Sequence, residues 1–323
     1  MNVLVLLDIS DTQREKLEGA APEARFIYPG VGGEAGSGLT MGSGATDGQV
    51  AAADVIIGNI PASRLAGAGR LKLLQLNSAG YDAYLAPGTM PAGASLCCAV
   101  GAYGQAVSEH VLAMVLSLMK RLPGYRDSQR EHAWVDLGPV TTLLGAHVLV
   151  LGCGDIGGHF ARLCSAMGAH VAGVRRHAGS APEGFESVHA MEGLQGLLPK
   201  ADVVASFLPS APSTRGLAGG RFFASMKPGA YFANGGRGDL VDEDALVAAL
   251  RSGHLAGAAL DVTDPEPLPA DNPLWDAPGA LITPHVSGGF HLPCVLDSIV
   301  DIAAGNLRRL RSGEPLRNEV ARG

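Results

Sequence analysis

The chain has 323 residues, which is enough for two domains and for a sizeable buried core. Hydrophobic residues make up 47% of the sequence and charged residues 17%, a balance typical of globular proteins. The formal net charge of −7 comes with no long run of one sign, which argues against general binding to the phosphate backbone of nucleic acids.

The number and spacing of the cysteines and the length of the apolar runs indicate the cell compartment. The five cysteines are an odd number without Cys-x-x-Cys spacing, so we expect reduced thiols, no disulfide framework and no metal site. The apolar run before Asp8 lacks a basic leader and is too short for a signal peptide. The longest later apolar stretch, residues 111–119, is too short to span a bilayer. We therefore expect a cytoplasmic protein without membrane insertion.

The first hundred residues alternate short apolar runs with polar or glycine-rich segments. Four of these runs predict buried parallel strands, at residues 3–7, 55–57, 71–76 and 95–98. The segment 30–48 is rich in Gly, Ser and Thr and predicts a long loop. Residues 106–122 are nearly all apolar, which predicts a helix that is buried on several sides and ended by Pro123-Gly124.

Strands and helices alternate about six times between residues 147 and 286. The predicted strands cover residues 147–151, 170–174, 202–207, 230–233, 258–262 and 280–283. This alternation favours a parallel, doubly wound sheet. A last helix over 293–310 is expected to return to the first domain. We therefore predict an α/β fold with two doubly wound domains, in which residues 101–289 are inserted between residues 1–100 and 290–323.

A glycine-rich turn follows the predicted strand at residues 147–151. The sequence Gly152-Cys-Gly154-Asp-Ile-Gly157 has the spacing Gly-x-Gly-x-x-Gly and opens a predicted helix. Gly152 permits the tight turn, Gly154 lets a pyrophosphate approach the backbone, and Gly157 lets helix and strand pack closely. Amides at the helix start would face the phosphates. The motif in this context predicts dinucleotide binding, and a bare structural turn is the alternative.

The residue that reads the adenosine ribose is expected about 20 residues further on, at the end of the next strand. That strand ends in Val174-Arg175-Arg176-His177, and no acid follows until Glu183. Two guanidinium groups suit a 2′-phosphate, whereas NAD sites usually place Asp or Glu at this position. We therefore expect NADP(H) to be preferred over NAD(H). The alternative is that both arginines are solvated surface residues.

Two later stretches carry a family signature. One runs Asn234-Gly-Gly-Arg237-Gly-Asp-Leu-Val-Asp, and the other runs from Ala259-Leu-Asp261 through Pro265-Glu266-Pro267 to Thr283-Pro-His285-Val-Ser-Gly288. With Asn77-Ser-Ala-Gly80-Tyr-Asp, they resemble the D-isomer-specific 2-hydroxyacid dehydrogenases, including glyoxylate/hydroxypyruvate reductases, over nearly the whole chain. The resemblance implies a Rossmann nucleotide domain inserted in a flavodoxin-like substrate domain. It implies hydride transfer between NAD(P)H and a small 2-oxo acid to give a D-2-hydroxy acid.

Arg237, Glu266 and His285 offer the groups that this reduction needs. Arg237 can hold the substrate carboxylate and polarise its carbonyl through forked donors. His285 can donate the proton, because imidazole titrates near working pH, and Glu266 would orient it and favour its charged form. The resemblance implies the same roles. The alternatives are a structural strand-end histidine, an exposed loop acid, and an arginine paired only with Asp239 or Asp242.

The resemblance also implies the binding residues. The backbone amides of Ser78, Ala79 and Gly80 would bind the substrate carboxylate, since small residues let these amides face a ligand. Asp261 would hold the nicotinamide carboxamide, and Pro209 and Thr214 would lie beside the adenine and phosphates. The expected cofactor-binding residues are Gly152, Gly154, Asp155, Ile156, Gly157, Arg175, Arg176, Pro209, Thr214, Gly235, Asp261 and Gly288.

A homodimer formed through the nucleotide domain is expected on two grounds. The helix at 106–122 carries more apolar surface than one small domain can bury, and the resemblance implies such a dimer. Because the substrate turn and His285 belong to different domains, we also expect the domains to close over the ligands and exclude water. We interpret His110, His132 and His291 as core or surface residues.

The sequence departs from the family after His285. The family often has Ala-Gly and then Thr there, whereas this chain has Ser287-Gly288-Gly289-Phe290, which alters the rim of the pocket and leaves substrate size open. Formate oxidation is disfavoured, because formate dehydrogenases of this superfamily place Gln at the position of Glu266. Enzymes that oxidise phosphite retain Glu at this position, so phosphite oxidation remains an alternative. A second alternative is the role of a nucleotide-sensing corepressor.

Overall fold

The computed structural model describes residues 1–30, 44–289 and 292–321. Two compact units divide the chain: unit 1 comprises Met1–Tyr103 with Gly288–Gly323, and unit 2 comprises Gly104–Ser287. Most of the loop predicted at 30–48 lies outside the described residues, as does His291. Within the described ranges, no helix is long and apolar enough to cross a membrane.

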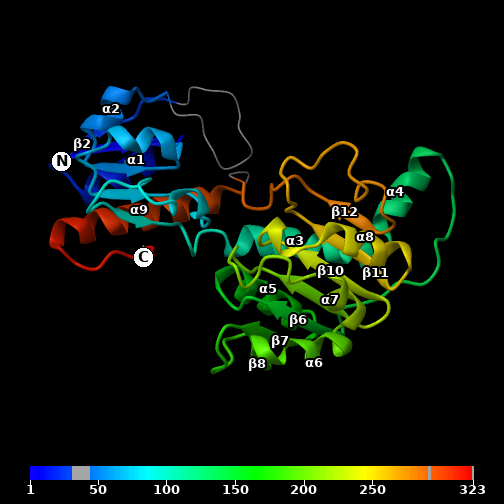
Figure 1. The fold of residues 1–323 in the computed structure, drawn as a ribbon. Helices are drawn as coiled ribbons and strands as arrows, with labels where there is room; N and C mark the ends of the chain where they lie inside the picture. The colour runs from blue at the N-terminus through cyan, green and yellow to red at the C-terminus, as the bar shows by residue number, and fades with distance from the viewer. Residues whose placement is uncertain (31–43, 290–291, 322–323) are drawn as a thin grey trace. The chain divides into compact units, whose positions relative to one another are not determined.

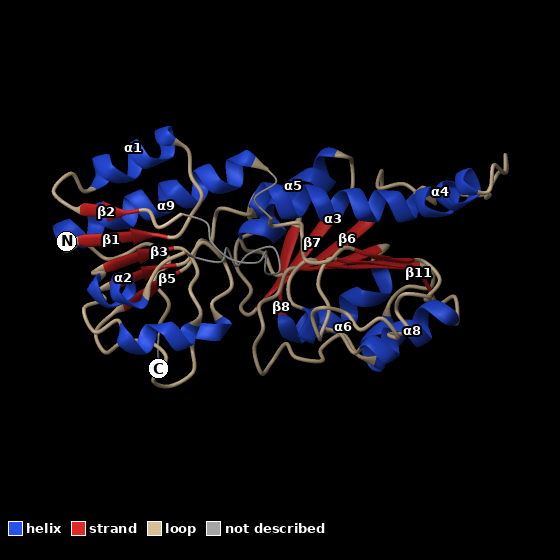
Figure 2. Ribbon diagram, turned by 90° about the horizontal axis from the view of Figure 1, so that it is seen from above, coloured by secondary structure: helices blue, strands red, loops and turns tan. Residues whose placement is uncertain are grey.

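Unit 1 is built on a five-stranded parallel sheet (Figure 1). Its spatial order is β2 (Arg25–Ile27), β1 (Asn2–Val5), β3 (Val55–Ile57), β4 (Leu73–Gln75) and β5 (Ser95–Cys97). This 2-1-3-4-5 order is that of flavodoxin-like folds. Figure 2 shows α1 (Asp11–Ala20) and α9 (Pro293–Ser312) together on one face of the sheet, with α2 (Asp47–Ala52) on the other.

Unit 2 is built on a seven-stranded parallel sheet. Its spatial order is β12 (Ala280–Ile282), β11 (Leu255–Leu260), β10 (Ala230–Asn234), β9 (Val203–Ser206), β6 (His147–Leu151), β7 (His170–Arg175) and β8 (Ser187–Ala190). Counted within the unit, strands 3-2-1-4-5-6 follow the Rossmann order, and β12 extends it by one strand. The prediction of two doubly wound α/β sheets is confirmed.

Helices cover both faces of the unit 2 sheet (Figure 2). One face carries α3 (Gly104–Met119) and α5 (Asp155–Ala166), and the other carries α6 (Leu194–Leu197), α7 (Gly220–Ser225) and α8 (Glu243–Arg251). Helix α8 begins as predicted, because the Asp242 carboxylate accepts a hydrogen bond from the Ala245 amide at 3.1 Å. The apolar core on this second face includes Phe222, Phe223 and Phe232.

Two strands were missed by the sequence analysis. Strands β2 and β8 lie at the edges of their sheets, and their side chains are exposed or only partly buried. Edge strands have a neighbour on one side only, so they lack the continuous apolar run of a buried strand. Their extended conformation depends on pairing with β1 and β7, which no local pattern reveals.

The long helix predicted over 106–122 is two helices, so that prediction was wrong in its C-terminal part. Helix α3 ends at Met119, and Arg121 adopts a left-handed conformation with φ 54°. Helix α4 (Leu122–Arg130) follows, with Pro123 in its first turn. Proline lacks an amide proton that the first turn does not need, so Pro123 starts a helix here and does not end one.

Candidate active site and cofactor pocket

The three predicted catalytic residues follow neighbouring strands of unit 2. Arg237 lies beyond the end of β10, Glu266 lies in the segment after β11, and His285 lies just beyond β12. The strands are parallel, so their carboxyl ends lie at one edge of the sheet, where ligands bind in folds of this class. The Nδ1 atom of His285 lies 2.8 Å from Oε2 of Glu266. Both side chains are about two-thirds buried, with exposed fractions of 29% and 35%.

The Asn234 side chain fixes the backbone around Arg237, and Gly238 brings that backbone close to the segment that carries Glu266. The buried Asn234 side chain donates to the Arg237 carbonyl oxygen at 2.9 Å and accepts from the Gly236 amide at 3.1 Å. A Cβ atom at Gly238 would lie 2.0 Å from the Thr263 carbonyl oxygen, so only glycine permits this approach. Asp239, a suggested partner of Arg237, is instead engaged with Ser210 and Arg215.

The electrostatic surroundings keep Glu266 ionised. Burial raises the pKa of its carboxyl group, but the hydrogen bond and charge of His285, the Thr263 amide and the charge of Arg237 act in the opposite direction. The net pKa lies below its ordinary value. The stabilisation from this ionised carboxylate is present above the unfolded pKa and is lost as pH falls through the folded pKa. At neutral pH the imidazole of His285 therefore faces a carboxylate.

Asp261 holds the loop that carries His285. Its side chain is 1% exposed, and it accepts hydrogen bonds from the Thr283 hydroxyl, the Val286 amide, and both the amide and hydroxyl of Ser287. The Asp261 carbonyl oxygen also accepts from the His285 amide at 2.8 Å. The residue expected at the nicotinamide carboxamide is thus already bonded to the chain through both carboxylate oxygens.

The glycine-rich turn opens α5 in the predicted context. A Cβ atom at Gly157 would lie 1.9 Å from the Gly152 carbonyl oxygen, so helix and turn could not pack with any other residue there. A Cβ atom at Gly154 would meet nothing within 4 Å. Gly154 is also the N-cap of α5, and no side-chain hydrogen bond caps this helix in the described residues. Packing does not require glycine at 154, whereas a pyrophosphate against the backbone would.

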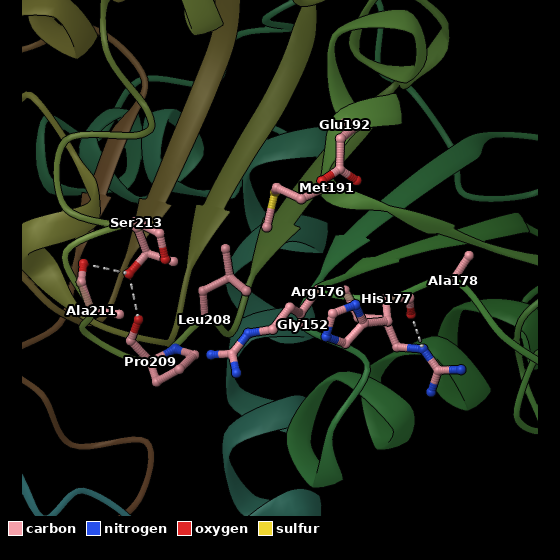
Figure 3. Close-up of a pocket in the computed structure, with 12 residues that line it drawn as sticks. Gly152, Arg176, His177, Ala178, Met191, Glu192, Leu208, Pro209, Ala211 and Ser213 are labelled. Carbon is pink, nitrogen blue, oxygen red and sulfur yellow. Dashed lines mark hydrogen bonds between the residues drawn. The ribbon is translucent and has the colours of Figure 1, made fainter. Parts of the chain in front are cut away.

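A pocket of about 780 Å³ lies beside this turn, at the carboxyl ends of β6, β7 and β9 (Figure 3). Small-molecule sites typically measure about 300–1,000 Å³. The pocket brings together five of the residues predicted for the cofactor: Gly152, Arg175, Arg176, Pro209 and Thr214. Of the other predicted cofactor residues, Gly154, Asp155, Ile156 and Gly157 open α5, and Gly235 follows β10. Asp261 and Gly288 are buried, Asp261 directly after β11 and Gly288 just after His285.

The two adjacent arginines have different surroundings. Arg175 donates from Nε to the His177 carbonyl oxygen at 3.0 Å and from a terminal nitrogen to the Ser180 carbonyl oxygen at 3.4 Å. Arg176 is exposed, and in the part of the chain that the structure describes its guanidinium has no hydrogen bond or ion pair. Figure 3 shows Arg176 extended across the pocket toward Pro209. Arg176 therefore has its donors available to an anion in the pocket.

Several lining residues escaped the sequence analysis. They are His177, Ala178, Met191, Glu192, Leu208, Ala211 and Ser213. His177 and Leu208 directly adjoin predicted residues, so proximity in sequence could have indicated them. Met191 and Glu192 follow the unrecognised edge strand β8, and no sequence signal marked them.

The predicted substrate turn lies in unit 1, beyond the end of β4. The Ser78 hydroxyl donates to the Gly80 carbonyl oxygen at 2.6 Å, and the Ser78 carbonyl oxygen accepts from the Ala99 amide. Across the described residues, the amides of Ala79 and Gly80 donate no hydrogen bond within the chain. Asn59, which the sequence analysis missed, accepts from the Asn77 amide and so braces the turn.

Comparison with known proteins identifies the family. Residues 112–287 match the model of the "D-isomer specific 2-hydroxyacid dehydrogenase, NAD binding domain". The chain belongs to this family. The match covers the glycine-rich turn, the pocket and all three predicted catalytic residues, so unit 2 contains the family's NAD-binding domain.

Individual relatives agree with this assignment. A glyoxylate/hydroxypyruvate reductase A from Serratia proteamaculans is 33% identical over 79% of this chain and 81% of its own length. A crystal structure of a family member from Aeromonas salmonicida is 33% identical, with a TM-score of 0.84 over 99% of this chain and 98% of that one. A member from Xanthobacter autotrophicus, solved with NADPH and MES, is 32% identical, with a TM-score of 0.78 over the same shares.

This family member departs from the usual sequence at Ser287, and the structure shows what the departure does. The Ser287 hydroxyl donates to Asp261 beneath the His285 loop, and the residue is 8% exposed. The alanine common in the family has no hydroxyl and could not make this bond. Its visible effect is an additional hydrogen bond on Asp261.

Proposed function

We propose that this protein reduces a small 2-oxo acid to the D-2-hydroxy acid, with Arg237, Glu266 and His285 as its catalytic residues. The observation that carries the proposal is the 2.8 Å contact between His285 and Glu266, with the charge of Arg237 acting on the same carboxylate. Membership of the dehydrogenase family and the similarity to a glyoxylate/hydroxypyruvate reductase support the substrate class.

The side chains divide the work as follows. NADPH, when bound, supplies the hydride. The carboxylate of Glu266 accepts a hydrogen bond from Nδ1–H of the His285 imidazolium. Nε2 then donates its own proton to the substrate oxygen. The forked guanidinium of Arg237 holds the substrate carboxylate and polarises the carbonyl. The free amides of Ala79 and Gly80 offer further donors to the carboxylate.

Residues in the pocket and in the glycine-rich turn beside it fit the adenosine and pyrophosphate of the cofactor. Gly154 leaves the backbone open at the start of α5, where the amides and the helix dipole favour a pyrophosphate. Arg176 offers unengaged donors to a 2′-phosphate, which supports NADP(H) as the preferred cofactor. The similar structure from Xanthobacter autotrophicus binds NADPH.

A substrate panel tests the proposal. Purified protein is mixed with glyoxylate, hydroxypyruvate, pyruvate or a bulkier 2-oxo acid, each with NADPH and with NADH, and the absorbance of reduced nicotinamide is followed. We expect NADPH oxidation with at least one of these acids and a D-configured product by chiral chromatography. Parallel reactions of formate and phosphite with NADP+ or NAD+ are expected to show no reduction. Turnover of phosphite without turnover of any 2-oxo acid would contradict the proposal.

Glu266→Gln is expected to shift the pH dependence of reduction. Proton donation needs the charged imidazole of His285, so the reduction rate falls as pH rises and the imidazole loses its proton. The charge of His285 is one of the causes that lower the pKa of Glu266, and this attraction is mutual, so we expect the carboxylate to support the proton-donating form of His285. Without that charge, kcat should fall to half its maximum at a lower pH than in wild type. Identical pH profiles for kcat in the two proteins would argue against this role.

We propose a homodimer formed through unit 2, although the structure changes the reason for expecting one. The apolar side chains of α3 are largely buried within the single chain, so that helix gives no surplus apolar surface. Exposed apolar residues lie instead on α4 and the segment after it, which extend away from the sheet of unit 2 (Figure 1): Leu122, Trp134, Val135 and Val140. Exposed apolar residues gathered on one segment suit an interface with a second copy.

Trp134→Glu is expected to convert the dimer to a monomer. Trp134 is fully exposed and lines a groove of about 600 Å³ with Tyr125 and His132. Sedimentation velocity at micromolar concentration should give a dimer for wild type and a monomer for this variant. Trp275→Glu is the matched control, because Trp275 is a half-exposed tryptophan elsewhere in unit 2 and should leave the dimer intact. A wild-type monomer would overturn the prediction.

A further inference from the structure

The loop that carries His285 is attached to helix α3 through a chain of side-chain hydrogen bonds. Nε2 of His110, on α3, lies 3.0 Å from the Thr283 hydroxyl oxygen. The Thr283 hydroxyl in turn lies 2.6 Å from Oδ1 of Asp261. Asp261 binds the amides of Val286 and Ser287 on the far side of His285. His110 therefore stands at the start of a path that ends on both sides of the proposed proton donor.

The direction of each hydrogen bond follows from the proton count. A hydroxyl has one proton, and the short contact with the buried Asp261 carboxylate takes the proton of Thr283. The sulfur of Met114, 3.6 Å away, is a weaker acceptor for the same proton. The Thr283 oxygen must then accept from His110, so Nε2 of His110 carries a proton and donates.

The His285 backbone needs such an anchor. His285 has φ 52°, in the left-handed region that is unfavourable for a residue with a side chain. Its amide donates to the carbonyl oxygens of Asp261 and Thr283, at 2.8 and 3.0 Å. The same two residues thus hold the His285 backbone and receive the bonds that begin at His110. A strained residue persists only where its surroundings fix it from several sides.

We propose that His110 is a positioning residue for the reaction. The hydrogen bond that its Nε2–H donates to the Thr283 hydroxyl fixes the contact between Thr283 and Asp261, and this contact fixes the conformation of the His285 loop. This proposal deepens the proposed function and rests on it where activity is concerned. His110 is not a general acid here, because its proton is directed at Thr283 and the path leads to a backbone anchor. The side chain is 30% exposed, so its burial alone does not explain a histidine at this position.

Four substitutions, three at His110 and one at Thr283, separate this bond from simple packing. His110→Gln retains an N–H donor near the position of Nε2, His110→Asn carries its donor near the position of Nδ1, and His110→Leu has none. Thr283→Val removes the hydroxyl and keeps the shape of the side chain. Thermal melting of each variant confirms that it folds before further measurement.

The first readout is independent of activity. Hydrogen–deuterium exchange, followed by mass spectrometry on the peptide that contains residues 283–288, reports how firmly the loop is held. We expect exchange at wild-type rates in His110→Gln, and faster exchange in His110→Asn, His110→Leu and Thr283→Val. Faster exchange confined to this peptide supports the proposal. Wild-type exchange in His110→Leu, or equal acceleration in all three His110 variants, would overturn it.

The second readout is kinetic. Loss of one neutral hydrogen bond corresponds to roughly 3- to 10-fold, so kcat should fall by that factor in His110→Asn and His110→Leu, with KM for NADPH unchanged. His110→Gln should restore most of kcat. Combining His110→Asn with Thr283→Val should cost no more than Thr283→Val alone, because both remove the same link. If the wild type reduces no 2-oxo acid, the proposed function fails, and the exchange data still decide the role of His110.

Discussion

Replacing His285 with alanine is expected to lower kcat for 2-oxo acid reduction by about 100- to 10,000-fold, the usual contribution of a general acid. The physical reason is that the imidazole, oriented by Glu266 at 2.8 Å, is the proposed proton donor to the carbonyl oxygen. NADPH binding should change little, since the cofactor pocket around Arg176 does not include His285. Steady-state kinetics give kcat, and fluorescence titration gives the Kd for NADPH.

His254→Ala is the matched control for His285→Ala. His254 precedes β11, whereas His285 follows β12. Because these strands are parallel, His254 lies at the amino ends of the strands and His285 at their carboxyl ends. The ring of His254 lies within hydrogen-bond distance of the Met226 carbonyl oxygen, and its removal should leave kcat near wild type. A kcat of His285→Ala within about threefold of the wild-type value would show that His285 is not the general acid.

Wild-type enzyme is expected to prefer NADPH over NADH, and Arg176→Ala is expected to abolish the preference. A hydrogen bond to a charged group contributes roughly 1.5–3 kcal/mol, which corresponds to a preference of about 10- to 150-fold. Arg176 is exposed, so screening by salt should place the value at the lower end of this range. The measurement is kcat/KM for both cofactors, in wild type and variant, at two ionic strengths.

Arg175→Ala is the comparison that tests the division between the two arginines. Arg175 is bonded to the carbonyl oxygens of His177 and Ser180, so it braces the loop and has fewer donors to offer a phosphate. Its removal should lower kcat/KM for NADPH and for NADH by similar factors, whereas removal of Arg176 should lower kcat/KM for NADPH selectively. Equal kcat/KM for both cofactors in wild type, or an unchanged preference in Arg176→Ala, would show that Arg176 does not read the 2′-phosphate.

Local patterns predicted much of the fold because they report burial directly. The continuous apolar runs of β3 and β6 mark strands covered on both faces, and they were predicted within their observed bounds. The acidic first turn of α8 and its Asp242 cap depend only on neighbouring residues, so they can be predicted directly from the sequence. Strands β2 and β8 were missed because edge strands are only partly buried, and their pairing is a tertiary property.

The sequence by itself determined the family motifs and the residue types at the candidate site. Gly152, Gly154 and Gly157, with Arg237, Glu266 and His285, occur in short motifs whose spacing encodes their local geometry. Tertiary structure decided which groups remain free and which are engaged. Arg175 and Arg176 are identical neighbours in sequence, yet only their surroundings show one bonded to the loop and the other open to the pocket. His110, taken from the sequence as a core or surface residue, gains its contact with Thr283 only because α3 packs near the end of β12, 173 positions away along the chain. Such contacts join residues remote in sequence, and no local pattern encodes them.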